Sequence, residues 1–271
     1  MPATMSAFSV FAIVWAGALG ACLGSFANVV AMRWHEGASL RGRSMCPDCQ
    51  TPLRARHLVP IVSWLWLHGR CAGCRRPIHV QYPLVEAAAA LLAVGAAWRH
   101  PPFASGSMAP FLFEALFLVA LLVPVVMDIR WKELPLEWLV GMGTVGLVAN
   151  VLGVGFVDAA DAWARLGSSL CAMALAALFF GLQWRLSRGR WLGEGDVWMG
   201  AALGAALGWP LVAWGVYAAY LLGGSVALLG LFAGAFRRGQ QMPFGPMLAA
   251  GAVVAAWLAP SAAVWMRIHW L

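Results

Sequence analysis

Long apolar runs, separated by short polar segments, are the feature that most constrains how this chain can fold. A helix needs about 20 mainly apolar residues to cross a bilayer, and most of the runs approach or exceed that length. Charged residues make up only 11% of the 271 residues, whereas they make up about 25% of a soluble domain. We therefore expect an all-α polytopic membrane protein with about eight transmembrane helices. The runs cover residues 6–30, 83–98, 111–127, 138–156, 166–184, 197–207, 211–236 and 246–265.

The distribution of Lys and Arg predicts the orientation of these spans. Eight crossings place 15 of the 18 basic residues on one side of the membrane, and the positive-inside rule makes that side cytoplasmic, with both termini outside. The run 197–207 is short for a span, so it is tilted, re-entrant or continuous with the next run; omitting it would move Arg237 and Arg238 to the other side, which favours keeping it. The net charge of +7 is thus a topology signal. Membrane lipids are expected partners, and nucleic acid is not.

Residues 31–82 form the one soluble segment, and its cysteines predict a metal site. Cys46 and Cys49 form one C-x2-C pair, and Cys71 and Cys74 form a second after a 21-residue spacer. This spacing is typical of four-thiolate zinc sites, although iron also accepts four thiolates. A segment of this size has too small a core to fold without such a staple. Two disulfides are the alternative, but they are rare in the reducing cytoplasm.

The predicted zinc is structural rather than catalytic. Four thiolates complete the tetrahedral coordination of zinc and leave no position for a reacting water. Histidines of the same segment offer alternative ligands, but nothing in their spacing assigns them a role: His35, His57, His68 and His79.

Two aspartates at the edges of apolar runs are the candidates for chemistry, because acids beside a span are rare and usually functional. Asp128 ends the run 111–127, and Asp196 closes the sequence Gly193-Glu194-Gly195-Asp196 before the run 197–207. Both fall on the predicted cytoplasmic side. Two close carboxylates can share a proton, so that one activates water while the other donates to a carbonyl oxygen. This pair predicts peptide-bond hydrolysis without a metal.

Each aspartate also has a purely structural interpretation. Asp196 could cap the following helix, and Asp128 could anchor its helix at the membrane edge by pairing with a nearby Arg or Lys. Two further acids lie inside apolar runs: Glu86 is expected to face the soluble segment, and Glu114 is expected to reach outward to water. Neither has a catalytic role from sequence alone.

Five blocks, in order along nearly the whole chain, resemble the type IV prepilin leader peptidases. The first is Gly24-Ser-Phe-Ala-Asn-Val-Val, and the second combines the four cysteines with Tyr82-Pro-Leu-Val-Glu. Asp128 with Leu134-Pro resembles the first catalytic motif of that family, and Gly193-Glu-Gly-Asp resembles the second. The fifth block is Pro243-Phe-Gly-Pro before the last run.

The resemblance implies a bifunctional enzyme of the bacterial inner membrane. Such an aspartic endopeptidase removes a basic leader after a glycine from prepilins or type II secretion pseudopilins, and it then N-methylates the new terminus with S-adenosylmethionine. It assigns Asp128 and Asp196 as the catalytic pair. With the bounds set by the apolar runs, the chain has a first transmembrane helix at 6–30, a cytoplasmic zinc domain at 31–82 and a helical core at 83–265. The resemblance associates the zinc domain with methylation and the helical core with the peptidase. No glycine-rich nucleotide loop locates the methyl donor in the sequence, so methylation depends on the resemblance alone.

The chain departs from the family pattern at two places. Trp198 stands where a basic residue is common, and Leu136 follows Pro135 where an acid is common. Because both aspartates remain, these differences bear on substrate preference rather than on the peptidase chemistry.

Two other classes of protein compete with the enzyme. A carboxylate-dependent transporter would also place acids near spans, but it would carry them at the bilayer midplane or show two related halves, and it does not explain the cysteines. A zinc-ribbon membrane adaptor would explain the cysteines and leave both aspartates dispensable.

Overall fold

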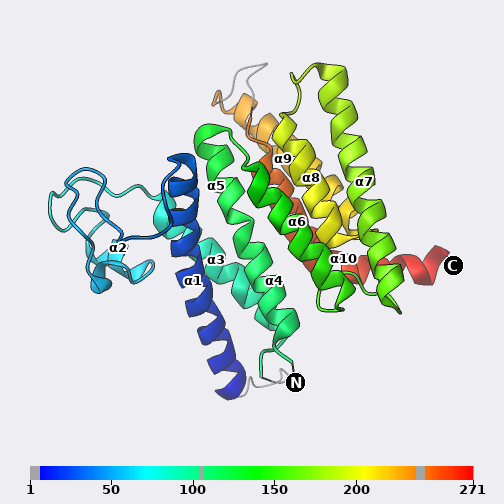
Figure 1. The fold of residues 1–271 in the computed structure, drawn as a ribbon, viewed down its shortest axis with the longest axis horizontal. Coiled ribbons are helices and arrows are strands. Elements are labelled where there is room, and N and C mark those ends of the chain that lie inside the picture. The colour runs from blue at the N-terminus through cyan, green and yellow to red at the C-terminus, as the bar shows by residue number, and fades with distance from the viewer. Residues whose placement is uncertain (1–6, 104–106, 236–241, 271) are drawn as a thin grey trace. The chain divides into compact units, whose positions relative to one another are not determined.

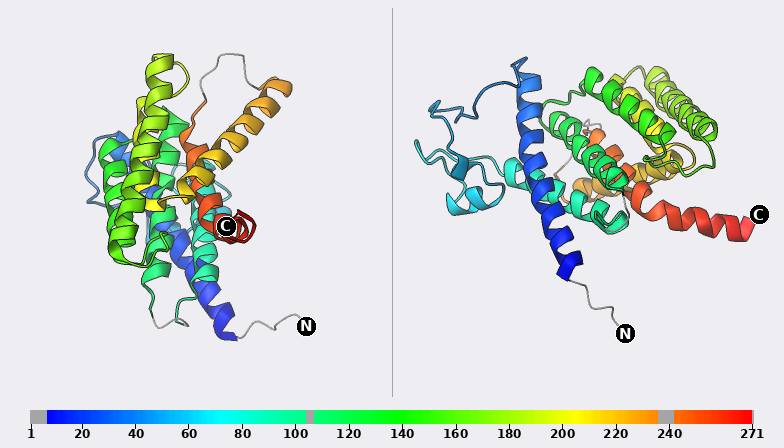
Figure 2. Two further views of the ribbon diagram at one scale, coloured as in Figure 1. Left: turned by 90° about the vertical axis from the view of Figure 1, so that its right-hand side faces the viewer. Right: turned by 60° about the horizontal axis from the view of Figure 1, so that its bottom comes forward.

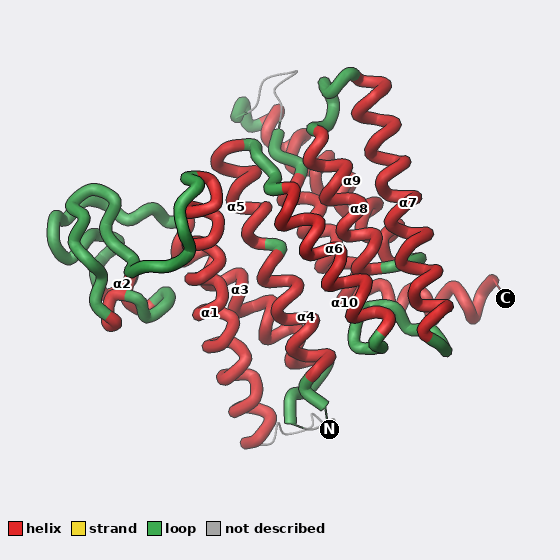
Figure 3. The backbone as a smooth tube through the Cα atoms, viewed as in Figure 1, coloured by secondary structure: helices red, strands yellow, loops and turns green. Residues whose placement is uncertain are grey.

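The computed structural model describes residues 7–103, 107–235 and 242–270, and these residues form helices without any strand (Figures 1 and 3). The expected all-α class is therefore confirmed. Residue 6, where the first predicted span begins, and Arg237 and Arg238 lie outside the described residues. The elements in chain order are α1 (Ala7–His35), η1 (Ala55–His57), α2 (Val62–Trp66), α3 (Gln81–Arg99), α4 (Ala109–Ala120), α5 (Leu122–Trp131), α6 (Leu136–Val151), α7 (Ala162–Ser187), α8 (Glu194–Leu207), α9 (Leu211–Phe232) and α10 (Gly245–Trp270).

Four stretches of the described helices are long and apolar enough to cross a membrane. They are Ser9–His35, Ala109–Trp131, Ala162–Ser187 and Leu211–Phe232. Leu136–Val151 and Gly245–Trp257 are apolar but shorter. The count of eight crossings remains a prediction.

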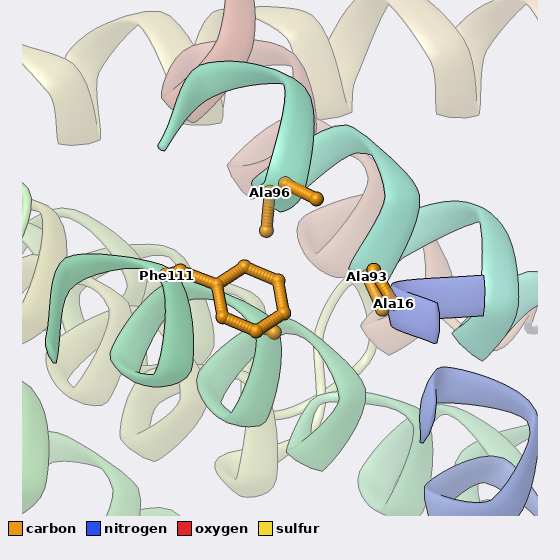
Figure 4. Packing of buried hydrophobic residues seen from close by; sticks show 6 residues of the cluster. Ala16, Ala93, Ala96 and Phe111 are labelled. Carbon is orange, nitrogen blue, oxygen red and sulfur yellow. The ribbon is translucent and has the colours of Figure 1, made fainter. Parts of the chain in front are cut away.

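The chain divides into two compact units, Met1–Val126 and Met127–Leu271. In the first unit, α1 packs closely along α3, because small residues line the contact: a Cβ added to Gly24 would come within 2.6 Å of the Ala89 Cβ. Phe111 of α4 packs against Ala16 of α1 and Ala93 of α3 (Figure 4). Small interfacial residues let apolar helices approach closely where the surrounding lipid provides no hydrophobic driving force.

Two acids of the first unit, Glu86 and Glu114, are buried and hydrogen-bonded. Glu114 is 1% exposed, and its carboxylate lies 3.1 Å from Arg99 Nη1 and 2.9 Å from His100 Nε2. Glu114 therefore does not reach outward as expected; the basic end of α3 pairs with it instead. Glu86 accepts a 2.7 Å hydrogen bond from the backbone N–H of Ile61, which confirms that it faces the soluble segment.

In the second unit, α8 is the central helix and packs against α6, α7 and α10 (Figure 1); α9 and α10 form a further packed pair (Figure 2). The 14 residues of α8 extend only about 21 Å, less than the hydrocarbon core of about 30 Å. The helix is nevertheless well enclosed, with nine buried residues. The chain turns at Gly208, where φ is 68°, so the predicted run 197–207 is a separate helix and does not continue into α9.

One buried amide joins three helices of this unit. Asn150 of α6 is fully buried, and its side-chain N–H groups donate to Ser169 Oγ at 2.9 Å and to the Ala206 carbonyl at 2.8 Å. Its Oδ1 accepts from the Val157 N–H at 3.1 Å. Each polar atom of this side chain therefore has a partner, as a buried amide requires.

Close packing of α6 on α8 can be tested with two glycines of α6. A Cβ at Gly146 would lie 2.6 Å from the Ala206 Cα, whereas a Cβ at Gly141 would meet nothing within 4 Å. We expect Gly146→Ala to lower the free energy of unfolding by about 1–3 kcal/mol through overpacking. We expect Gly141→Ala to be neutral or stabilising, since alanine is the better helix former. Thermal unfolding in one detergent compares the two variants; equal melting temperatures would contradict the packing described.

Candidate active site and metal centre

Asp128 lies in α5, which continues past the predicted end of the apolar run to Trp131. The side chain is 6% exposed, and its Oδ2 accepts a 2.7 Å hydrogen bond from the backbone N–H of Gly245. Gly245 is the first residue of α10. The carboxylate of Asp128 is thus held at the N-terminus of a helix that follows it by more than one hundred residues.

Asp196 lies in the first turn of α8 and is also 6% exposed. Gly193, not Asp196, occupies the N-cap position. The Asp196 Oδ2 accepts from the Gly193 N–H at 2.9 Å, and the Gly193 carbonyl accepts from the Asp196 N–H at 3.3 Å. Asp196 is therefore not the N-cap itself. Its carboxylate accepts a hydrogen bond from the N-cap residue Gly193, as the acidic residue of a capping box does.

The two aspartates belong to the same compact unit and lie near one another. The segments that carry them are in contact, since a Cβ on Gly195 would lie 2.7 Å from the Leu134 Cβ, and α10, whose first residue bonds to Asp128, packs against α8. The N-termini of α8 and α10 therefore lie at the two carboxylates. Backbone N–H groups at a helix N-terminus carry partial positive charge, which stabilises carboxylates with little access to water.

Gly245 has to be a glycine for this arrangement to form. A Cβ at this position would lie 2.7 Å from Asp128 Oδ2 and 3.3 Å from the Asp128 Cβ. The Pro243-Phe-Gly-Pro block thus places a backbone donor against the first aspartate. The sequence identifies this block only by resemblance, because a glycine has no side chain to indicate its role.

An aromatic and amide group next to Phe244, the neighbour of Gly245, is a further feature that the sequence did not indicate. The Tyr220 hydroxyl donates to Gln183 Oε1 at 2.7 Å. The Tyr220 ring lies 5.2 Å from the Phe244 ring and stacks at 6.5 Å on Phe180. Tyr220 is one of three tyrosines in the chain, and Tyr217 lies in the same apolar run, so nothing in the sequence distinguishes Tyr220.

The four predicted cysteine ligands come together in the first unit. Their sulfur atoms all lie within 4.8 Å of one another, and no histidine belongs to the group. Cys46 Sγ is 3.9 Å from Cys74 Sγ, and Cys49 Sγ is 4.0 Å from Cys71 Sγ. Tetrahedral zinc with bonds of about 2.3 Å requires sulfur atoms about 3.8 Å apart. The observed spacing therefore fits zinc.

Two equivalent turns produce this spacing. The Cys46 N–H donates to the Thr51 carbonyl and the Cys71 N–H donates to the Arg76 carbonyl, at 3.1 and 2.9 Å. The residue after each C-x2-C pair, Gln50 or Arg75, has a left-handed φ of 55° or 63°. In each C-x2-C pair this turn points both sulfurs in one direction, so that the two turns together can form one four-sulfur site.

Hydrogen bonds also prepare two of the thiols to be ligands, because backbone hydrogen bonds from Cys74 and Gly73 lower the pKa of the Cys71 thiol as well. Hydrogen bonding to Thr51 lowers the pKa of the Cys49 thiol to about 6. For Cys74, a backbone hydrogen bond to Arg76 lowers the pKa, but desolvation and the neighbouring cysteines outweigh it and raise the pKa to about 11. A bound metal cation would hold both sulfurs as thiolates despite their different pKa values, because the thiolate is the form that ligates metals.

Comparison with known proteins gives consistent matches over most of the chain. Residues 18–100 match the bacterial peptidase A24 N-terminal domain, and residues 115–228 match the type IV leader peptidase family. The prepilin leader peptidase/N-methyltransferase of Aeromonas hydrophila is 35% identical over 220 residues, which cover 80% of this chain and 70% of that protein. The protein of the same name from Pectobacterium carotovorum subsp. carotovorum is 34% identical over 272 residues, which cover 90% of this chain and 93% of that protein. No solved structure matches significantly.

Metal content tests the cysteine site directly. We expect purified wild-type protein to carry about one zinc ion per chain, since four thiolates complete one tetrahedral site. Cys46→Ser should lose that zinc and destabilise the segment, because the metal contributes to its folding. Cys22→Ser and Cys171→Ser are matched controls, as both residues are exposed and lie outside the cluster. Elemental analysis makes the comparison, and full zinc occupancy in Cys46→Ser would exclude the proposed ligand set.

Proposed function

Because the chain belongs to the type IV leader peptidase family, we propose that it removes the leader peptide from prepilins or pseudopilins by a paired-aspartate mechanism. The observation that carries the proposal is the placement of two buried aspartates, from separate motifs, at the N-termini of α8 and α10. N-methylation of the new terminus with S-adenosylmethionine is the second proposed activity, and the names of the relatives support it.

The two carboxylates divide the work of hydrolysis between them. One, ionised, removes a proton from water as the water oxygen bonds to the carbonyl carbon of the scissile peptide, and the other, protonated, gives its proton to the carbonyl oxygen. The tetrahedral gem-diol then breaks its C–N bond as the departing amine takes a proton from the first carboxyl and one diol hydroxyl returns a proton to the second carboxylate. This restores the starting protonation states of both aspartates. The leader leaves with a new carboxylate and the mature protein with a new amino group. No covalent intermediate is needed.

Backbone bonds keep both carboxylates in position for this chemistry. The Gly245 and Gly193 N–H groups each occupy one oxygen, Oδ2 of Asp128 and Oδ2 of Asp196. Each Oδ1 is then the atom that can face water or the substrate carbonyl. Holding the groups in place before substrate arrives lowers the barrier because no reorganisation is required during the reaction.

The membrane position of the site would select the bond that is cut. We propose that the apolar helix of the prepilin lies in the bilayer while its basic leader extends into the cytoplasm, so that the scissile bond lies at the depth of Asp128 and Asp196. The protein would be a multi-pass protein of the bacterial inner membrane with both termini outside. The basic segments flanking the apolar runs support this orientation.

The zinc segment and the helical core have separate proposed roles. Residues 31–82 would form the cytoplasmic domain associated with methylation, held together by structural zinc on Cys46, Cys49, Cys71 and Cys74. Four sulfurs at tetrahedral spacing support a closed site, which gives the metal no position for a reacting water. Residues 83–265 would form the helical peptidase core.

Conservative replacement of each aspartate tests the mechanism. We expect Asp128→Asn and Asp196→Asn each to lower leader cleavage by about 10²–10⁴-fold, because each removes a proton-transfer group. Glu194→Gln, at an exposed acid of the same turn, should cleave nearly as well as wild type. Mass spectrometry of a synthetic prepilin scores leader loss and methylation together. Near-wild-type cleavage by either folded Asn variant would refute the paired mechanism.

The contact between Gly245 and Asp128 gives a second test. We expect Gly245→Ala to lower the cleavage rate by about 10²-fold, because a methyl group displaces the carboxylate by the order of an ångström. Gly224→Ala is the control, since a Cβ there meets nothing within 4 Å. Single-turnover cleavage rates decide between them. Equal rates for the two variants would mean that the Gly245 N–H does not position Asp128.

A further inference from the structure

The segment around α2 leaves one face of large apolar side chains uncovered. Their exposed fractions range from 43% to 62%. Val62, Leu65 and Trp66 share one side of α2 because they are three and four residues apart, and Leu58 and Val59 lie just before the helix. We call this set the α2 face: Leu58, Val59, Val62, Leu65 and Trp66. The opposite side is packed: Ser63 is 9% exposed, and the Trp64 indole donates to the Ile78 carbonyl at 3.2 Å. One side of the segment is therefore packed against the protein, and the other side exposes apolar side chains.

A hydrogen bond fixes this segment to α3, which packs along the candidate membrane span α1. The Ile61 N–H, immediately before α2, donates to Glu86 Oε2 of α3 at 2.7 Å. Glu86 lies level with Gly24 of α1, since a Cβ at Gly24 would be 2.9 Å from the Glu86 Cα, and α1 is a candidate span over Ser9–His35. The start of α2 is thus held at the depth of Gly24.

This depth can be compared with the thickness of the lipid headgroups. Arg33, at the basic end of α1, is nine residues beyond Gly24, which corresponds to about 14 Å along the helix. The headgroup region of one leaflet is only about 5–8 Å thick. With Arg33 at the outer limit of that region, the start of α2 lies about 6–9 Å below the boundary between headgroups and acyl chains. Interfacial helices bury their apolar faces about 5–10 Å into this boundary.

Charge around the α2 face matches anionic lipid. Arg54, Arg56 and Arg70 flank the face in the sequence, all three are exposed, and residues 54–70 contain no acid. Arginine beside an apolar face with an interfacial Trp is the pattern of segments that bind negatively charged membrane surfaces. The leader of a prepilin, which we expect to be basic, would be repelled by the same arginines. Charge therefore favours lipid over substrate.

We propose that the α2 face lies in the cytoplasmic leaflet and that Arg54, Arg56 and Arg70 bind anionic phospholipid headgroups. The cysteine segment is then attached to the membrane surface by its own lipid contacts as well as by α1 and α3. The inference rests on the membrane orientation proposed above, but it does not depend on the catalytic pair.

Site-specific photo-crosslinking of the full chain in lipid nanodiscs tests the proposal. The discs contain phosphatidylcholine with a minority of phosphatidylglycerol, and p-benzoylphenylalanine replaces Trp66 in one variant and Leu40 in another. Leu40 is the matched control: it is 46% exposed in the same segment, but its carbonyl accepts from Arg33 at the cytoplasmic end of α1. We expect lipid adducts mainly at position 66, with phosphatidylglycerol enriched over its share of the disc. The combined R54Q, R56Q and R70Q change should reduce that enrichment about five-fold or more.

Three results would overturn the proposal. They are equal lipid adducts at the two positions, adducts of position 66 with a prepilin or a second copy instead of lipid, and phosphatidylglycerol enrichment that survives the triple change. The unmodified chain supplies a second measurement, because its amides in residues 58–68 should exchange hydrogen more slowly in discs with phosphatidylglycerol than without it. Leader cleavage in the same discs separates the two hypotheses. Adducts without cleavage refute only the proposed function, and cleavage without adducts refutes only the lipid site.

Discussion

The hydrogen bond from the Gly245 backbone to Asp128 joins the beginning and the end of the second unit, and the arrangement of the candidate site depends on it. Asp128 would otherwise be a buried carboxylate with little access to water, which is costly unless the group is hydrogen-bonded. The first residue of α10 supplies the donor to Asp128. The N-cap residue of α8, Gly193, supplies the corresponding donor to Asp196. Two helix N-termini thus hold two carboxylates near one another, which is what shared proton chemistry requires.

Small residues make this convergence possible. The short helix α8 reaches the site only because α6 and α7 approach it closely, at Gly146 against Ala206 and at Gly204 against the backbone of Ala172. Larger side chains would separate the helices and move the first turn of α8, and Asp196 with it. The buried amide of Asn150 adds a directional link between the same three helices. Packing at one end of the unit therefore determines geometry at the other.

The sequence predicts the parts of this protein that have a local chemical signature. The spacing of the cysteine pairs predicts the four-sulfur cluster, and the apolar runs predict helices throughout. The rarity of acids in the chain nominates Asp128 and Asp196. The sequence could not predict the partner of Glu114 or the role of Gly245, because these depend on contacts between distant segments and, for Gly245, on the absence of a side chain. The five residues of the α2 face are likewise ordinary apolar residues until the fold leaves them exposed.

The central claim is that Asp128 and Asp196 act as one unit, and the double variant tests it most directly. Single-turnover cleavage of a synthetic prepilin would be followed for wild type, Asp128→Asn, Asp196→Asn and the variant with both changes. Residues that act together are strongly non-additive, so we expect the double variant to be no slower than the slower single variant. A double variant whose loss is the product of the two single losses would show that the aspartates act independently, and it would refute the paired mechanism.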